Sequence, residues 1–116
     1  MKSSQVFRAL MLCVSLCIIS SSAFAADKKE VIKVWGNCGM CKKTIEKSLK
    51  DVEGVKSAIW NKQTKMLDVN FDDSKISIKQ IEAKVAGSGY DTQNIKGDDK
   101  AYKNLNECCQ YDRKKS

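Results

Sequence analysis

The motif Cys38-Gly39-Met40-Cys41 lies between a strand-like run at residues 31–35 and a helix-like run that begins at Cys41. Apolar residues of the second run recur at three- and four-residue steps, which is typical of a helix with one buried face. These residues are Cys41, Ile45, Leu49 and Val52. Two thiols three residues apart at a helix start can close on one small target. That target is either a soft metal ion or the other thiol, in a redox disulfide.

The next part of the chain predicts a β-hairpin. Residues 55–60 and 65–71 are both strand-like, and the short polar stretch 61–64 between them predicts the turn. Apolar and polar residues alternate along the second of these strands, which indicates one buried and one solvated face. Its expected buried residues are Leu67, Val69 and Phe71.

A second helix is expected to begin near Ser77, because Ser77 and Gln80 have the spacing of a capping box. Its buried stripe is expected at Ile78, Ile81 and Val85. Residues 92–95 predict a short fourth strand. The order strand, helix, strand, strand, helix, strand is typical of the split βαβ or ferredoxin-like arrangement. We therefore expect an α+β sandwich, a four-stranded antiparallel sheet with two helices on one face, plus a short C-terminal extension.

The first 25 residues have the features of a secretory signal peptide. Lys2 and Arg8 give a positive start, and residues 9–19 form an apolar run that is shorter than the roughly 20 residues of a membrane span. Ala23-Phe24-Ala25 matches an A-x-A cleavage site. We expect cleavage after Ala25 and a periplasmic or secreted mature protein, with an uncleaved membrane anchor as the alternative.

The remaining 91 residues suffice for one small domain at residues 26–96 and a cysteine-containing C-terminal tail at residues 97–116. Without Lys2 and Arg8 the chain keeps 19 basic and 14 acidic residues, a charge of +5. The lysines are scattered among acids, which predicts a solvated surface, and nucleic acid is a poor partner for such a chain. No second apolar segment follows, so no stable membrane insertion is expected after signal removal.

Four cysteines remain after cleavage: Cys38, Cys41, Cys108 and Cys109. Both pairs are local, so a disulfide within either would close only a tiny loop and restrict the unfolded chain little. The chain contains no histidine, so a metal site must use sulfur, with or without carboxylate help. Two sulfurs suit a soft ion such as Cu(I) or Hg(II), whereas a structural zinc site normally takes four ligands. Met40 is expected to pack against the domain, with a thioether ligand as the alternative.

The strand, the Cys-x-x-Cys loop, the helix and the element order resemble the heavy-metal-associated domain family over residues 31–95. That family includes copper chaperones, metal-binding domains of copper-transporting ATPases, and the exported mercuric-ion-binding protein. Its loop usually reads Gly-Met-Thr-Cys-x-x-Cys, and the matching stretch here is Trp35-Gly36-Asn37-Cys38-Gly39-Met40-Cys41. The resemblance implies that Cys38 and Cys41 bind the metal. Gly36 stands where the family has a methionine packed beneath the loop, so either Met40 replaces that methionine or the loop is looser.

Gly89-Tyr90-Asp91 matches an element that follows the second helix of the family. The resemblance implies that Tyr90 lies near the metal, and a plain core aromatic is the alternative.

The tail cysteines are not part of the common family pattern. Adjacent cysteines rarely bridge each other without strain. One hypothesis is that the tail folds back, so that Cys108 or Cys109 completes a three- or four-sulfur site; a disulfide or a dimer contact is the alternative. Tyr102, Leu105 and Cys109 are expected on one side of a further short helix, and residues 113–115 are expected to be a frayed basic end.

The expected function is that of an exported protein that binds Cu(I), Hg(II) or another thiophilic ion without a catalytic step. It would buffer the ion or pass it to a membrane transporter or another carrier. A thiol–disulfide oxidoreductase that uses the same cysteine pair is the alternative, and Trp35 near the motif fits it. Against it, the chain has no proline, whereas thioredoxin-like sites keep a cis-proline facing the cysteines. An interaction module without metal leaves Cys38 and Cys41 without a role.

Overall fold

The computed structural model describes residues 27–115 of the 116-residue chain. The predicted signal peptide, residues 1–25, lies outside the described residues. The elements are β1 (Asp27–Lys33), α2 (Gly39–Leu49), β2 (Val55–Trp60), β3 (Met66–Asp72), α3 (Ile78–Gly87), α4 (Asp99–Lys103) and the 3₁₀ helix η2 (Glu107–Cys109). Within this part of the chain, no helix is both long enough and apolar enough to span a bilayer.

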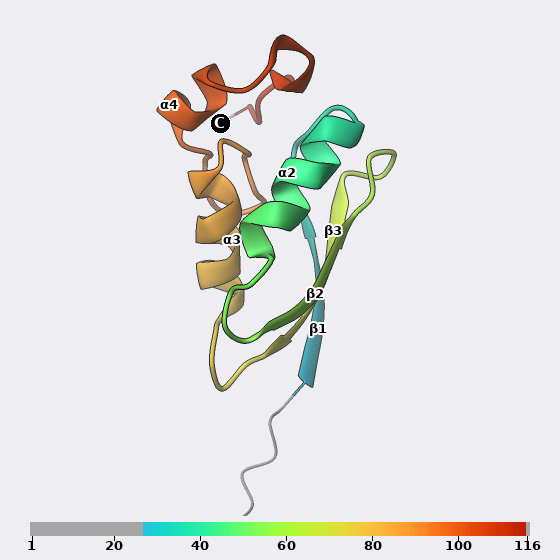
Figure 1. Ribbon diagram of the computed structural model, residues 1–116, viewed down its shortest axis with the longest axis vertical. Helices are drawn as coiled ribbons and strands as arrows, with labels where there is room; N and C mark the ends of the chain where they lie inside the picture. Colours follow the sequence, from blue (N-terminus) through green and yellow to red (C-terminus); the bar gives the residue numbers. More distant parts are fainter. Residues whose placement is uncertain (1–26, 116) are drawn as a thin grey trace, which may run out of the picture.

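The sheet is antiparallel, with β3 in the centre and the order β1-β3-β2. Both long helices lie on the same side of it, with α2 against β2 and α3 beside α2 (Figure 1). Leu67 of β3 pairs with Ile32 on one side and Trp60 on the other, and all three side chains are buried. The alternation predicted for β3 is correct, because Leu67, Val69 and Phe71 are buried.

The first strand is longer at its start than the sequence predicts. The charged residues 27–30 precede the strand-like run predicted at residues 31–35, yet they belong to β1 and pair with residues 69–72 of β3. Their side chains remain exposed or partly exposed. Backbone pairing with a central strand therefore extends β1 although its side chains gain no burial, since strand hydrogen bonds do not depend on the side chain.

The described sheet has three strands rather than the four that were expected. At residues 92–95 the chain turns back, because both the backbone N–H and the hydroxyl of Thr92 donate to the Ile95 carbonyl oxygen. The backbone of Thr92 still forms one isolated antiparallel bridge to Val34. That bridge holds the segment after α3 beside the loop that carries the cysteines.

The two long helices begin differently, since a capping side chain bonds a free N–H group at the start of α3 but not at the start of α2. α3 has the predicted capping box, in which Ser77 and Gln80 each bond the other's backbone N–H group. α2 begins at Gly39, two residues earlier than predicted, and its buried residues are Cys41, Ile45 and Leu49. Burial of this stripe points Cys41 into the domain while the helix start stays at the surface.

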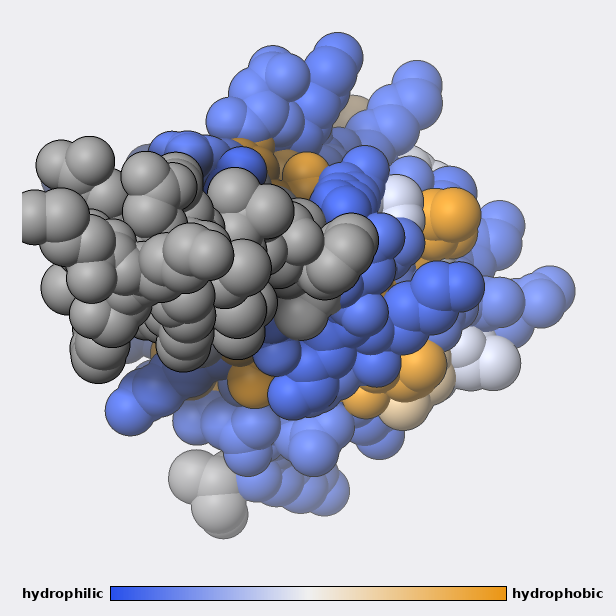
Figure 2. Space-filling model, turned by 90° about the horizontal axis from the view of Figure 1, so that it is seen from below, coloured by the Kyte–Doolittle hydropathy of each residue, from blue (hydrophilic) through white to orange (hydrophobic). Residues whose placement is uncertain are grey.

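The surface that Figure 2 shows is mostly hydrophilic, with small separate apolar patches. Among the described residues, the large apolar side chains that remain exposed are Val31, Met40 and Ile59. The buried apolar side chains form one core, which includes Cys109 and Tyr111 of the tail.

The tail docks onto the end of the domain near the start of α2 (Figure 1). The single short helix expected there is divided into α4 and η2. Two glycines allow the close approach: a Cβ on Gly89 would lie 2.8 Å from the Tyr102 backbone nitrogen, and one on Gly97 would lie 2.7 Å from the Tyr90 carbonyl carbon. Gly89 also has a φ of +104°, a conformation that other residues rarely adopt.

Candidate metal site

The first two sulfurs lie at the N-terminus of α2. Cys38 is the N-cap residue, and Cys41 lies in the first turn on the buried face of the helix. Their Sγ atoms are 3.9 Å apart, and both cysteines are free thiols. Cys41 is fully buried and Cys38 is partly exposed. The pair therefore has one sulfur anchored in the core and one that a ligand can reach from solvent.

The start of the helix favours the thiolate form of Cys38. The backbone N–H groups of Cys41 and then Met40 lower the pKa of the Cys38 thiol from its ordinary value of 9.0 to about 7. The sulfur makes no capping hydrogen bond of ordinary geometry, so the N–H dipoles act on it through space. A sulfur that ionises near neutral pH is ready to bind a metal ion.

Trp60 supports the loop from below. Its indole Nε1 donates to the Val34 carbonyl oxygen at 3.0 Å, and its ring is fully buried. A Cβ on Gly36 would lie 2.8 Å from this ring, so Trp60 fills the space beneath the loop. Trp60, from β2, therefore fills the space that a methionine at position 36 would occupy. Local patterns in the sequence do not indicate this role of Trp60.

The tail brings two further sulfurs to the same place. Cys109 Sγ lies 4.0 Å from Cys38 Sγ and 3.9 Å from Cys108 Sγ. The sulfurs of Cys38, Cys108 and Cys109 all lie within 4.8 Å of one another. Cys109 is buried and Cys108 is exposed, and both are free thiols. The four cysteines thus form one cluster, with Cys38 in contact with both pairs.

Cys109 differs from Cys38 in its protonation. Burial, followed by the neighbouring Cys41 thiol, raises the pKa of Cys109 well above its ordinary value. Cys109 is therefore a neutral thiol at physiological pH, and it must lose its proton when it binds a cation.

The position of Met40 contradicts the expectation that it packs against the domain. Its side chain is 47% exposed, and its sulfur accepts a hydrogen bond from the Cys108 thiol at 3.5 Å. Met40 stands on the solvent side of α2 because the first turn already directs Cys41 inward. Its thioether lies at the rim of the sulfur cluster.

Tyr90 belongs to the core and also lies beside the site. It is fully buried, and its hydroxyl faces Cys41 without forming a hydrogen bond of normal length to any described residue. Burial, and after it the neighbouring Cys41, raises the pKa of Tyr90 above its ordinary value. Tyr90 is thus a core aromatic, and its place beside Cys41 is compatible with a position near a bound metal ion.

Tyr111 and Arg113 hold the tail in place. The Tyr111 ring stacks on Tyr90 with centroids 5.5 Å apart, while its hydroxyl donates to the Gly89 carbonyl oxygen at 2.8 Å. Arg113 donates to the buried Asp91 carboxylate at 2.7 Å and to the Gly97 carbonyl oxygen at 2.7 Å. The expectation of a frayed basic end is therefore wrong at Arg113, because a buried carboxylate more than 20 residues away in sequence needs a cationic partner.

Burial alone would raise the pKa of Asp91. Hydrogen bonds from Arg113 and from the backbone N–H groups of Gly97 and Lys114 outweigh burial and hold the pKa below its ordinary value. Asp91 is therefore ionised when the tail is docked.

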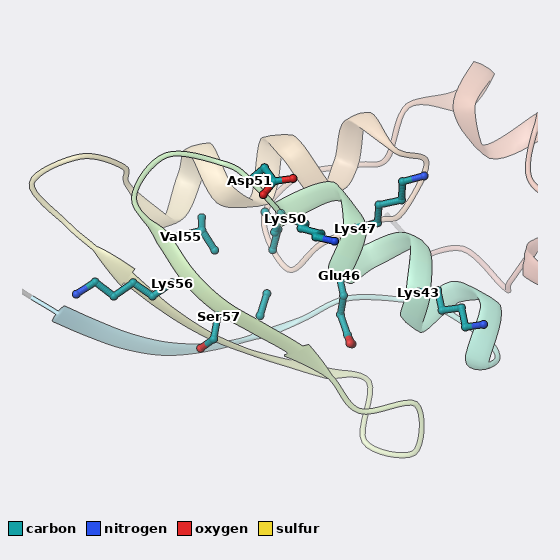
Figure 3. Close-up of a pocket in the computed structure, with 10 residues that line it drawn as sticks. Lys43, Glu46, Lys47, Lys50, Asp51, Val55, Lys56 and Ser57 are labelled. Atoms are coloured by element: carbon teal, nitrogen blue, oxygen red, sulfur yellow. The ribbon is translucent and has the colours of Figure 1, made fainter.

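A separate groove lies between α2 and β2, away from the sulfurs. It is lined by Lys43, Glu46, Lys47, Leu49, Lys50, Asp51, Val55, Lys56, Ser57 and Ala58. Figure 3 shows charged side chains from α2 and Lys56 from β2 around it. Its lining contains no cysteine, so the groove is not part of the metal site.

The sequence has clear relatives among known proteins. The model of the heavy-metal-associated domain matches residues 37–91, which includes Cys38 and Cys41 and ends before the tail. The copper chaperone CopZ of Staphylococcus aureus is 36% identical over 64 residues, which cover 54% of this chain and 94% of that protein.

Solved structures agree with this relation. Oxidised MerP from Ralstonia metallidurans CH34 superposes with a TM-score of 0.56 and 30% identity, over 59% of this chain and 96% of that one. The N-terminal domain of a potential copper-translocating P-type ATPase from Bacillus subtilis, in the Cu(I)-loaded state, gives a TM-score of 0.55 and 26% identity. That match covers 58% of this chain and 85% of the domain.

Proposed function

This chain belongs to the heavy-metal-associated domain family, and on that premise we propose that it carries a thiophilic metal ion, Cu(I), through Cys38 and Cys41. One observation supports the proposal above the others: the two sulfurs are 3.9 Å apart at the N-terminus of α2, one buried and one accessible. Soft thiolates at this spacing select soft cations over Mg²⁺ or Ca²⁺.

The mechanism is exchange of thiolate ligands, with no bond of a substrate made or broken. An incoming Cu(I) ion replaces the proton of each thiol, and Cys38 is the first to bind, because it is accessible and already ionises near pH 7. The buried Cys41 then closes the pair. Release follows when the thiolates of an acceptor reach the accessible Cys38 first and replace those of the carrier one at a time.

We also propose that the protein acts outside the cytoplasm, after loss of residues 1–25, and delivers its ion to a membrane transporter. The signal-like composition of those residues supports the first part. The similarity to the N-terminal domain of a potential copper-translocating P-type ATPase supports the second. Two thiolate sulfurs also suit Hg(II), which is therefore the other candidate ion.

The test is an anaerobic titration of the reduced protein with Cu(I), Hg(II) and Zn(II), compared with the Cys38→Ser/Cys41→Ser variant. We expect tight uptake of Cu(I) by the wild type, weaker retention of Zn(II), and loss of tight Cu(I) uptake in the variant. Equal Cu(I) uptake by the two proteins would contradict the proposal.

The oxidoreductase alternative has no support from the relatives described above, one of which is named a copper chaperone. A measured reduction potential and an insulin-reduction assay test it directly. Activity at the level of thioredoxin would restore that alternative.

A further inference from the structure

We propose that the C-terminal tail supplies part of the metal site. The Cu(I) ion that Cys38 and Cys41 take up is then held through three thiolates, those of Cys38, Cys108 and Cys109, as the two tail sulfurs replace Cys41. The inference rests on the proposed function, since it assumes that the ion enters at Cys38. It goes beyond that function because the family match ends at residue 91, so neither tail cysteine falls within it.

The spacing of the sulfurs supports three-fold binding. An ion about 2.3 Å from each of three coplanar sulfurs separates them by about 4 Å, whereas two sulfurs opposite each other across the ion are about 4.6 Å apart. The Cys38–Cys109 separation is 4.0 Å and the Cys108–Cys109 separation is 3.9 Å. The third separation, Cys38 to Cys108, is at most 4.8 Å. A small movement of the exposed Cys108 side chain completes the triangle.

The tail is positioned before any ion binds. On the C-terminal side of the cysteines, Tyr111 stacks on Tyr90 and Arg113 pairs with the buried Asp91. The two cysteines themselves lie in η2, which is closed by a 2.7 Å hydrogen bond from the Cys109 N–H to the Asn106 carbonyl oxygen. Ordering a free tail would cost conformational entropy, so a docked tail offers its thiols at little further cost.

The loop and the tail also contact each other directly. The Asn37 side-chain amide donates to the Cys108 carbonyl oxygen at 3.2 Å, and the Cys38 thiol approaches the same oxygen at 3.6 Å. Both contacts join residues at least 70 positions apart in the sequence. The two halves of the cluster therefore share backbone contacts as well as a common sulfur.

The burial of the four sulfurs suggests an order of exchange. Cys108 is exposed, Cys38 is partly exposed, and Cys41 and Cys109 are buried. An acceptor thiolate meets Cys108 first, so the bond from Cys108 to the ion breaks first. The ion then remains on Cys38 and Cys109. The tail thus strengthens retention of the ion while it leaves a stepwise route for release.

The experiment is a competition titration of the reduced protein with Cu(I) against a chromophoric Cu(I) chelator, combined with X-ray absorption of the loaded protein. The variants are Cys108→Ser/Cys109→Ser, Cys108→Ser alone, and Cys38→Ser/Cys41→Ser. Glu107→Gln is the matched control, an exposed change in the same 3₁₀ turn that leaves every thiol in place.

We expect three Cu–S bonds in the wild type and in the control, and two in the Cys108→Ser/Cys109→Ser variant. Affinity in that variant should fall about 10- to 100-fold, since a ligand held in place acts at a high effective concentration. Cys108→Ser alone removes only an exposed thiol and should also lower the affinity for Cu(I). Because this change leaves the buried core intact, a lower affinity would reflect a lost ligand and not damage to the core.

Two outcomes overturn the inference in different ways. If the wild type binds Cu(I) through two sulfurs with the affinity of Cys108→Ser/Cys109→Ser, the tail is not a ligand and the proposed function stands. If the wild type binds no more Cu(I) than Cys38→Ser/Cys41→Ser, the proposed function fails and the inference fails with it.

Discussion

At the scale of single residues, Cys38 has the central position. Its sulfur lies within 4.0 Å of a sulfur from the motif and of a sulfur from the tail. Its pKa is lowered, whereas that of Cys109 is raised, although the two side chains are neighbours. The difference arises because backbone N–H groups face Cys38 while the core surrounds Cys109.

This difference predicts the order in which the thiols are alkylated. In the reduced protein, the rate at which iodoacetamide modifies Cys38 should rise through pH 7 and level off above about pH 8, because the thiolate is the nucleophile. Peptide mapping by mass spectrometry gives the rate at each cysteine, and the unfolded protein in urea is the control. Faster reaction at Cys108 than at Cys38 around pH 7 would contradict the prediction.

The contact between Gly36 and Trp60 predicts a second effect. Gly36→Ala should lower the free energy of unfolding by about 1–3 kcal/mol, because a Cβ there meets the buried ring and forces it to move. Gly39→Ala is the matched control at the start of α2, since a Cβ at that position meets no atom within 4 Å. Urea denaturation of both variants measures the effect, and equal stability of the two would remove Trp60 as the support of the loop.

At the scale of elements, the tail is held by a small number of polar contacts around Asp91. Arg113, the Gly97 N–H and the Lys114 N–H all donate to this one carboxylate. The stack of Tyr111 on Tyr90 adds an apolar contact on the other side. The position of η2 and its cysteines therefore depends on residues that follow them in the sequence.

Arg113→Gln should loosen the tail without unfolding the domain. Loss of a charged hydrogen-bond donor to a buried carboxylate costs about 1.5–3 kcal/mol. We expect amide hydrogen exchange in residues 107–115 to become at least about tenfold faster, since 1.4 kcal/mol corresponds to a factor of ten. Lys115→Gln, at an exposed position two residues on, should leave exchange unchanged. Equal protection of residues 107–115 in Arg113→Gln and Lys115→Gln would show that Arg113 does not hold the tail.

Acid should release the tail in the wild type. The pKa of Asp91 is lower in the folded state than in the unfolded chain, so its contribution to stability is present in full above the unfolded pKa of about 3.9 and is lost as pH falls through the folded value. Protection of residues 107–115 against hydrogen exchange, measured relative to the intrinsic exchange rate at each pH, should therefore fall below about pH 4. Arg113→Gln should show a smaller change with pH, because the interaction that lowers the pKa has already been removed. An identical pH dependence in the two proteins would argue against this ion pair.

At the scale of the whole molecule, local patterns account for much of the fold. The stripe of Cys41, Ile45 and Leu49 and the alternation along β3 depend on neighbouring residues, and both are visible in the sequence. The capping box at Ser77 is equally local. These features determine the order of elements and place Cys38 and Cys41 at a helix start.

The remaining features depend on contacts between distant parts of the chain. Trp60 beneath the loop and Arg113 on Asp91 join segments more than 20 residues apart, and no periodicity marks either contact. The segment at residues 92–95 is a turn rather than a strand, because the Thr92 N–H donates to the Ile95 carbonyl oxygen within the segment. The sequence supports a folded-back tail only as a hypothesis. The sulfur separations come from the three-dimensional structure.

One prediction concerns the molecule as a unit. Addition of one equivalent of Cu(I) should slow amide exchange in both residues 36–41 and residues 105–111, because one ion joins the loop to the tail. A Cu(I) chelator should reverse both effects. In Cys108→Ser/Cys109→Ser, only the loop should remain protected. Protection confined to the loop in the wild type would show that the ion does not reach the tail.

The close approach at Gly89 and Gly97 has a consequence for protein engineering. Because the backbones of two segments touch there, the tail fits only where the recipient lacks a side chain at the position of Gly89 and the tail keeps Gly97. Transplanting residues 97–115 onto another member of the family should succeed only where the recipient offers a glycine equivalent to Gly89. Whether such a graft folds would therefore depend on the absence of a Cβ atom at the position of Gly89, which is not one of the sulfur ligands.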